Sequence, residues 1–129
     1  MKYVYPAVFT KEGNLYSVNF PDLQSCYTSG EGLANAFEMA EDVLSFTLYF
    51  LEKDNKPVPY ASDIKSVACD GDSFVNLIHC DTDDYRRLKD NKAIKKTLTI
   101  PTWLNYEAEK HNINFSQILQ DGLRRELNV

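Results

Sequence analysis

The hydrophobic period of this chain changes at Leu33, and this change limits the fold more than any other feature of the sequence. Before Leu33, short runs alternate apolar and polar residues, as β-strands do; after it, apolar residues recur every three to four positions, as on one side of an α-helix. The pattern predicts short strands covered by one long helix. The members of the helical stripe are Leu33, Ala36, Phe37, Ala40, Val43, Leu44, Thr47, Leu48 and Leu51.

Three β-rich runs precede this helix. Residues 3–10 and 15–20 are joined by Lys-Glu-Gly-Asn, which predicts a hairpin, and a short strand around residues 26–28 ends at Gly30. Pro6 cannot donate to a ladder, so we expect it at an edge or a bulge. Strand character returns at residues 73–80. The fold class is therefore predicted as α+β, with a β-β-β-α-β body in which a helix covers one face of a mainly antiparallel sheet.

The predicted helix is apolar on more than the stripe that faces the sheet. Met39, Phe46, Tyr49 and Phe50 widen its apolar surface to one side. Two interpretations remain open at this point: a wide contact with the core, or an interface with another protein. The polar side is expected to carry Glu38, Glu41, Asp42, Ser45 and Glu52.

Charge divides the chain into an acidic body and a basic tail. Residues 1–85 hold 5 Lys and Arg against 14 Asp and Glu, net −9, whereas residues 86–129 hold 9 against 5, net +4. Between the two parts, Asp81 is expected to cap a short helix that runs to Leu88, with Asp84 in its first turn. An acidic surface is usually just solvated, but it can also meet a basic partner.

The basic tail alternates strictly at its start. In a strand over residues 95–101, Leu98 and Ile100 face one side, and Lys95, Thr97 and Thr99 face the other. Pro101 then suits the first turn of a helix that reaches residues 111–112. A second helix is expected to begin at Asn114, a capping residue, with Gln117 at the capping-box position.

These 35 or so residues carry more apolar side chains than one copy can bury. Two copies that pair their strands about a two-fold axis would bury them and also satisfy the open strand edge. The resulting ribbon fits a major groove, with Lys95, Thr97 and Thr99 toward the bases, while the helix start at Asn114, Phe115 and Ser116 can hold a phosphate. The expected dimer core is Leu98, Ile100, Trp103, Leu104, Ile118, Leu119 and Leu123, with Ile113 and Phe115 beside it.

The motifs resemble a known family. KKTLTIPTWLN followed by NFSQILQDGL resembles the ribbon-helix-helix module at the C-terminus of HicB-type antitoxins, and YPAVF, YSVNFPDLQSCYTSG and LANAFEMAEDVL resemble the HicB domain, whose fold is similar to an incomplete RNase H-like fold. The resemblance implies a toxin-neutralising domain at 1–85, a linker at 86–94 and a ribbon-helix-helix module at 95–129. The chain departs from the family pattern at Gly32, where a Ser, Thr or Asp cap is common, and at Gly122 inside the last helix.

The resemblance implies a cytoplasmic antitoxin that inhibits a HicA-type toxin, a small basic RNA-cleaving protein, and binds the operator DNA of its own operon. It would act as a homodimer or a higher homo-oligomer. The alternative is a stand-alone ribbon-helix-helix transcription regulator with a ligand-sensing N-terminal domain. The candidates for toxin contact are Phe20, Asp22 and Tyr27, although core and turn roles explain these three residues equally well.

We expect no enzyme, no cofactor, no metal and no membrane contact. Two-metal hydrolysis needs carboxylates that converge from strands and a helix. The candidate acids fall instead in predicted turns and at a helix start, His79 and His111 lie far apart without a nucleophile, and the three cysteines form no CxxC pair. No apolar run reaches the roughly 18 to 20 residues of a membrane span. The acids in question are Asp22, Asp70, Asp72, Asp81, Asp83 and Asp84, and the cysteines are Cys26, Cys69 and Cys80.

Overall fold

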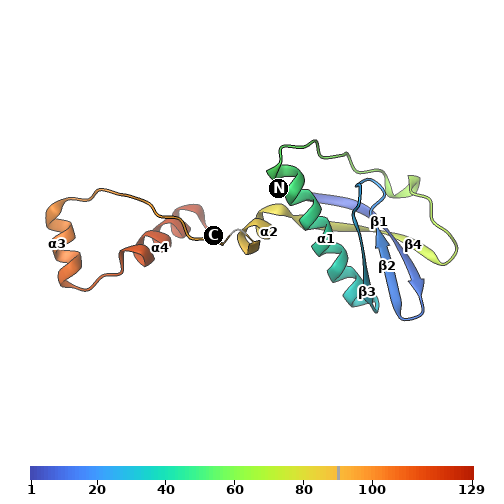
Figure 1. Cartoon of the computed structure of the whole chain (residues 1–129), viewed down its shortest axis with the longest axis horizontal. Helices are drawn as coiled ribbons and strands as arrows, with labels where there is room; N and C mark the ends of the chain where they lie inside the picture. The colour runs from blue at the N-terminus through green and yellow to red at the C-terminus, as the bar shows by residue number, and fades with distance from the viewer. Residues whose placement is uncertain (90) are drawn as a thin grey trace. The chain divides into compact units, whose positions relative to one another are not determined.

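The computed structural model describes residues 1–89 and 91–129, and it forms two compact units, Met1–Lys92 and Ala93–Val129. The fold is mixed α+β, with a four-stranded antiparallel sheet and four α-helices among the described residues (Figure 1). The first unit contains β1 (Lys2–Glu12), β2 (Leu15–Asn19), β3 (Tyr27–Glu31), α1 (Leu33–Lys53), the short 3₁₀ helix η1 (Ile64–Ser66), β4 (Ser73–Asp81) and α2 (Thr82–Lys89), and the second contains α3 (Thr102–Lys110) and α4 (Phe115–Leu127).

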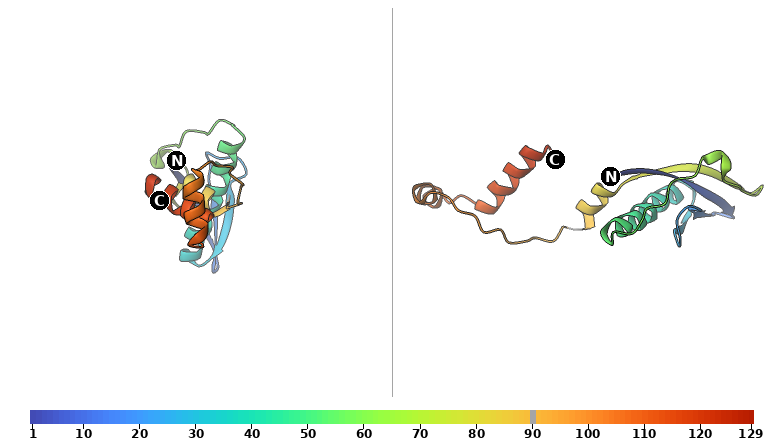
Figure 2. Two further views of the ribbon diagram at one scale, coloured as in Figure 1. Left: turned by 90° about the vertical axis from the view of Figure 1, so that its left-hand side faces the viewer. Right: turned by 90° about the horizontal axis from the view of Figure 1, so that it is seen from above.

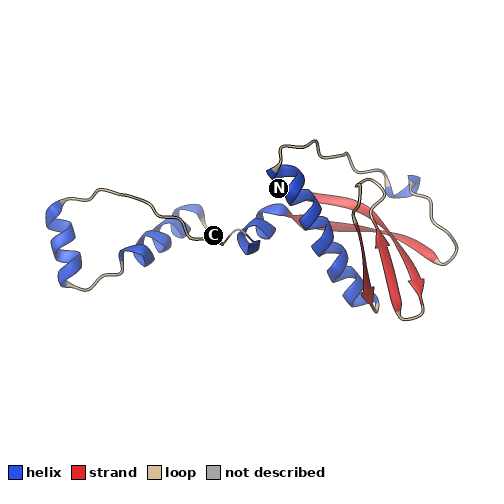
Figure 3. Cartoon of the chain, in the orientation of Figure 1, coloured by secondary structure: helices blue, strands red, loops and turns tan. Residues whose placement is uncertain are grey.

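The strands follow the order β3-β2-β1-β4, and each neighbouring pair is antiparallel. β1 is the longest strand and pairs with β4 from Lys2–Asp81 to Thr10–Ser73, which joins segments about seventy residues apart in the sequence. The long helix α1 lies against one face of this sheet (Figures 2 and 3). The predicted β-β-β-α-β body with its antiparallel sheet is therefore confirmed.

The expectation that Pro6 lies at an edge is wrong for the strand as a whole, because β1 is a central strand. At Pro6 itself, however, β1 pairs only with β4. Pro6 pairs with Leu77 of β4, whereas the β1–β2 ladder begins at Val8–Asn19. The N–H of Lys11 donates to the oxygen of Asp72, so the odd-numbered residues of β1 turn their N–H groups toward β4 and Pro6 faces the β2 side. Continued past Asn19, the register would bring Pro21 opposite Pro6, and neither proline has an N–H to donate.

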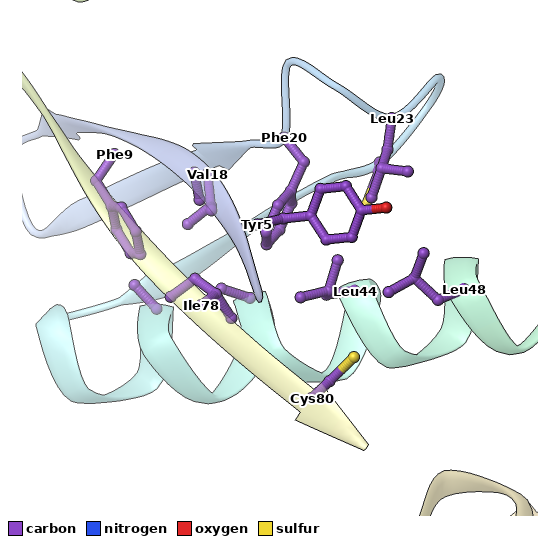
Figure 4. Close-up of a cluster of buried hydrophobic side chains, with 13 residues drawn as sticks. Tyr5, Phe9, Val18, Phe20, Leu23, Leu44, Leu48, Ile78 and Cys80 are labelled. Atoms are coloured by element: carbon purple, nitrogen blue, oxygen red, sulfur yellow. The ribbon is translucent and has the colours of Figure 1, made fainter. Parts of the chain in front are cut away.

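The core lies between the sheet and α1 (Figure 4). Phe9 packs between two other aromatic rings, with centroids 4.8 Å from Phe37 and 5.0 Å from Phe74. β3 comes so close to the start of α1 that a Cβ atom on Gly30 would lie 2.5 Å from both the Cα and the N of Ala36. The strand-borne core residues are Tyr5, Ala7, Phe9, Val18, Ile78 and Cys80; Phe20, Leu23 and Cys26 come from the connection between β2 and β3; and α1 adds Ala36, Ala40, Leu44 and Leu48.

Three residues of α1 differ from the predicted stripe. Leu33, predicted to face the sheet, is 46% exposed at the first position of the helix. Ser45, predicted on the polar side, is buried, and its hydroxyl donates to the Glu41 oxygen at 2.8 Å. Glu52, also predicted polar and exposed, is largely covered. The last two differences have separate causes: Ser45 lies beside Cys80 of β4, whereas Glu52 is covered by its contacts with Thr82 and Arg86 of α2.

The helix ends follow local chemistry. Gly32 precedes α1 with φ +81° and no side-chain cap, and the Asn35 side chain accepts from the Glu31 N–H at 3.0 Å, which links the end of β3 to the first turn of the helix. Asp81 caps α2 as predicted by accepting from the Asp83 N–H at 3.0 Å. Capping by Asn114 is confirmed as well, since it accepts from the Gln117 N–H at 3.1 Å. The Gln117 side chain instead donates to Asp121, so the reciprocal half of the capping box is not formed.

The predicted strand over residues 95–101 is not formed in the single chain, where residues 91–101 belong to neither a helix nor a strand. A strand needs a neighbour to accept and donate its backbone hydrogen bonds, and one copy of the module offers none in the predicted arrangement. The two helices that follow form as predicted, but neither contains a buried residue.

Candidate interaction surfaces

The residues predicted to read DNA all lie in the second unit. Lys95, Thr97 and Thr99 are exposed on the extended segment before α3. Phe115 and Ser116 open α4, where helical geometry leaves backbone N–H groups without an intrahelical acceptor. The Asn114 side chain caps the helix, so in the single chain this residue has a structural role.

The residues predicted to form the dimer core are uncovered in the single chain. Trp103 is 68% exposed and Leu98 58% exposed, whereas Leu119 is half-buried. Isolated exposed apolar residues are common, but this number of them on one small unit is typical of an interaction site. The sequence analysis missed Tyr106, Leu127 and Val129, which are exposed on the same unit. The exposed members of the predicted set are Leu98, Ile100, Trp103, Leu104, Ile118 and Leu123.

Of the three residues predicted to contact a toxin, Phe20 is a wrong prediction. Phe20 continues the inward alternation of β2 and is fully buried, so it belongs to the core. Asp22 is a turn residue that accepts from the backbone N–H of Ser62 at 2.8 Å and from its hydroxyl, and thereby ties the segment after α1 to the β2–β3 connection. Tyr27 is 68% exposed on the edge strand β3 and is free to meet a partner.

The apolar side of α1 divides into a buried and an exposed part. Tyr49 is buried and contacts Tyr85 of α2, with ring centroids 5.3 Å apart, which agrees with the core interpretation for this residue. Met39, Phe46 and Phe50 are instead 38%, 50% and 40% exposed. We call these three residues the outer ridge.

A polar cluster that the sequence did not reveal joins α1, β1 and α2. The Glu52 carboxylate accepts from the Tyr3 hydroxyl at 3.3 Å and from the Thr82 hydroxyl at 3.1 Å, and its other oxygen lies 3.9 Å from the Arg86 guanidinium. Desolvation, followed by the charge of Glu52, raises the pKa of Tyr3 to about 12. Because these residues lie 30 to 80 positions apart, periodicity gave no signal for them. The cluster fastens α2 to the body.

The side chains that could carry chemistry are dispersed. Among residues 1–89 and 91–129, no three His, Cys, Asp or Glu side chains gather as a metal site would require. Burial raises the pKa of the Cys80 thiol to about 11, which keeps it protonated and poorly nucleophilic near neutral pH. None of the described helices is both long enough and apolar enough to cross a membrane.

Comparisons with known proteins agree with this arrangement. The family described as "HicB_like antitoxin of bacterial toxin-antitoxin system" matches residues 5–121. A chain of a toxin–antitoxin complex from Streptococcus pneumoniae is 31% identical, with a TM-score of 0.64 over 98% of this chain and 99% of that one. The antitoxin HicB3 shares the fold at 21% identity, with a TM-score of 0.53 over 96% and 97%. A 14.9 kDa protein of Haemophilus phage HP1 is 24% identical over 83% of this chain and 80% of its own length. The chain therefore belongs to the family of HicB-like antitoxins of bacterial toxin–antitoxin systems.

Proposed function

We propose that this antitoxin inhibits a HicA-type RNA-cleaving toxin through its first unit and represses its own operon through a C-terminal ribbon-helix-helix dimer. The observation that carries the proposal is the contrast between the two units. The first has a complete core and an acidic surface, and the second has two helices without a buried residue. A unit that exposes its apolar residues is built for a partner, and the strand-helix-helix order makes a second copy that partner.

Operator binding would come from the paired strands of two copies. Pairing residues 95–101 about a two-fold axis would supply the missing ladder, cover Leu98 and Ile100, and turn Lys95, Thr97 and Thr99 toward the major groove. The starts of both α4 helices, at Phe115 and Ser116, would hold phosphates on either side. The net charge of +4 on residues 86–129 favours this contact with the DNA backbone.

Toxin inhibition would come from the acidic body. A protein that cleaves RNA must present positive charge to its substrate, and the net charge of −9 on residues 1–85 speeds the encounter with such a protein. The inhibition we propose is steric and electrostatic occlusion, and it needs no chemistry from the antitoxin. We also infer that the β-β-β-α-β body corresponds to a partial RNase H-like fold, which its element order supports.

Co-expression with a HicA-type toxin tests the proposal. We expect relief of growth arrest and a complex that co-purifies. The Thr97→Ala and Thr99→Ala variants should each lose about 1 to 3 kcal/mol of specific operator binding and still relieve the arrest. Lys95→Ala should mainly lower the salt dependence of DNA binding. A chain that binds DNA but never relieves the arrest would instead be a stand-alone transcription regulator.

A further inference from the structure

α1 carries exposed apolar side chains that adjoin its buried face. Ala36, Ala40, Leu44 and Leu48 are fully buried against the sheet, whereas the outer ridge is exposed. At about 100° per residue, Met39, Phe46 and Phe50 fall within about 40° of one another and about 140° from Leu44. An amphipathic helix that only covers a sheet needs one apolar stripe, and a stripe that extends into solvent is typical of a helix with a further partner.

The two aromatic side chains of the outer ridge pack against each other and against their neighbours on α1. The rings of Phe46 and Phe50 lie 4.8 Å apart, and the ring of Tyr49 meets Phe50 edge-on at 5.2 Å. The ammonium of Lys53 lies 5.9 Å from the centre of the Phe50 ring. Aromatic side chains that are held in place lose little conformational freedom on binding, which is a property of binding hot spots.

Charge indicates what kind of molecule covers the outer ridge. Asp42 and Glu38 are exposed about 40° and 80° from Phe46 around the helix, whereas Glu41 lies on the other side of it. A second copy of this face would bring like charges together and is disfavoured, whereas a basic protein would gain attraction from them. The uncovered face of the sheet also exposes apolar side chains, those of Val4, Leu15, Tyr27 and Leu77, but its exposed charges are of both signs, with Lys2, Glu12 and Glu31.

We propose that the outer ridge is the docking surface for a basic protein. Apolar side chains of this partner pack against Met39, Phe46 and Phe50, and its cationic side chains pair with the carboxylates of Glu38 and Asp42. This inference rests on the proposed function, under which the basic protein is the toxin. It moves the main contact away from Phe20 and Asp22 to the solvent side of α1. Tyr27, on the far edge of the sheet, is not required for it.

The test uses the full chain and the HicA-type toxin that it neutralises in co-expression, with affinity measured by calorimetry. Phe46→Ser should weaken binding at least about 30-fold, as expected for an aromatic hot spot. The matched control is Leu77→Ser, an equally exposed apolar residue on the sheet, which should stay within about threefold of wild type. A second variant leaves the ridge intact: Asp42→Lys should slow association, and most strongly at low salt.

Each outcome bears on a different statement. If wild type binds the toxin and Phe46→Ser binds within about threefold of it, the outer ridge is not the docking surface. If Phe46→Ser keeps toxin affinity and lowers the oligomeric state, a second copy covers the ridge and the proposal is overturned. If wild type binds no toxin, the proposed function itself fails. Circular dichroism and operator binding show whether Phe46→Ser has lost its fold. If it has, the association rate of Asp42→Lys tests the docking surface, and a rate equal to that of wild type overturns the proposal.

Discussion

Gly30→Ala should be the most damaging small substitution in the body, because the added methyl group has no space. Its Cβ would lie 2.5 Å from the Cα and the N of Ala36 and 2.8 Å from the carbonyl carbon of Asn35, and real Cβ contacts are essentially never under 3.0 Å. All three atoms belong to the backbone, so no side chain can swing away. Relief would require α1 to move about 1 Å from β3, which loosens the packing of Ala36, Ala40 and Leu44.

The expected cost follows from this displacement. Overpacking costs about 1 to 3 kcal/mol and sometimes more, and we expect about 3 kcal/mol because the contact is with backbone. With a urea m value of about 2 kcal/mol/M, the unfolding midpoint should fall by about 1.5 M. Circular dichroism during urea titration measures it, at one fixed protein concentration because dimer formation would shift the midpoint.

The control for this prediction is Gly71→Ala, since a Cβ there meets nothing within 4 Å. Its midpoint should stay near that of wild type or rise slightly. Gly30 does not have a positive φ, so the cost at this position comes from the clash alone. A Gly30→Ala midpoint within about 0.3 M of wild type would refute the reasoning, and so would rescue by Ala36→Gly, which removes only a side chain.

Leu44→Ala should lower the free energy of unfolding by about 2 to 5 kcal/mol in urea titrations, whereas Leu33→Ala, on the exposed first residue of α1, should cost much less. Asn114→Ala should cost about 0.5 to 2 kcal/mol by leaving the Gln117 N–H uncapped, seen as a loss of helical signal in the second unit. Tyr3 has a folded pKa of about 12, above its ordinary value of 10, so its contribution to stability is complete below pH 10 and is lost as the pH rises toward 12. Unfolding titrations at pH 9 and 11 should show a smaller decline for Tyr3→Phe than for wild type, and equal declines would contradict this assignment.

The sequence predicted what depends on local pattern. The alternation of residues 3–10 and 73–80 and the 3.6-residue period after Leu33 identified the strands and α1, and Asp81 and Asn114 marked helix starts. These features are local because a face repeats every two residues in a strand and every three to four in a helix. Most ends of these elements were predicted to within one or two residues, but β3 extends to Glu31, three residues beyond the predicted 26–28, and Gly30 lies inside this strand and does not end it.

What the sequence could not predict depends on contacts between distant segments. Ser45 and Glu52 have a polar pattern, but β4 covers the first and α2 the second, and nothing near these positions signals segments about 30 residues further along the chain. Phe20 and Tyr27 both flank the β2–β3 connection, yet one is fully buried and the other 68% exposed. Their difference is decided by which side of the sheet α1 covers, and the sequence does not state that side.

Pro6 and Pro21, just beyond the end of the β1–β2 ladder, also disfavour a hairpin that pairs in a shifted register. Hairpins with a polar turn can pair in a shifted register, and a shift of two residues keeps every side chain on its proper face, so hydrophobic burial alone does not correct it. A ladder extended toward the N-terminus would require N–H donation from Pro6, and one extended beyond Asn19 would require it from Pro21. Neither residue can donate, so the misregistered hairpins that use these positions lose hydrogen bonds that the native hairpin keeps. The native register is thereby selected by the backbone as well as by the core.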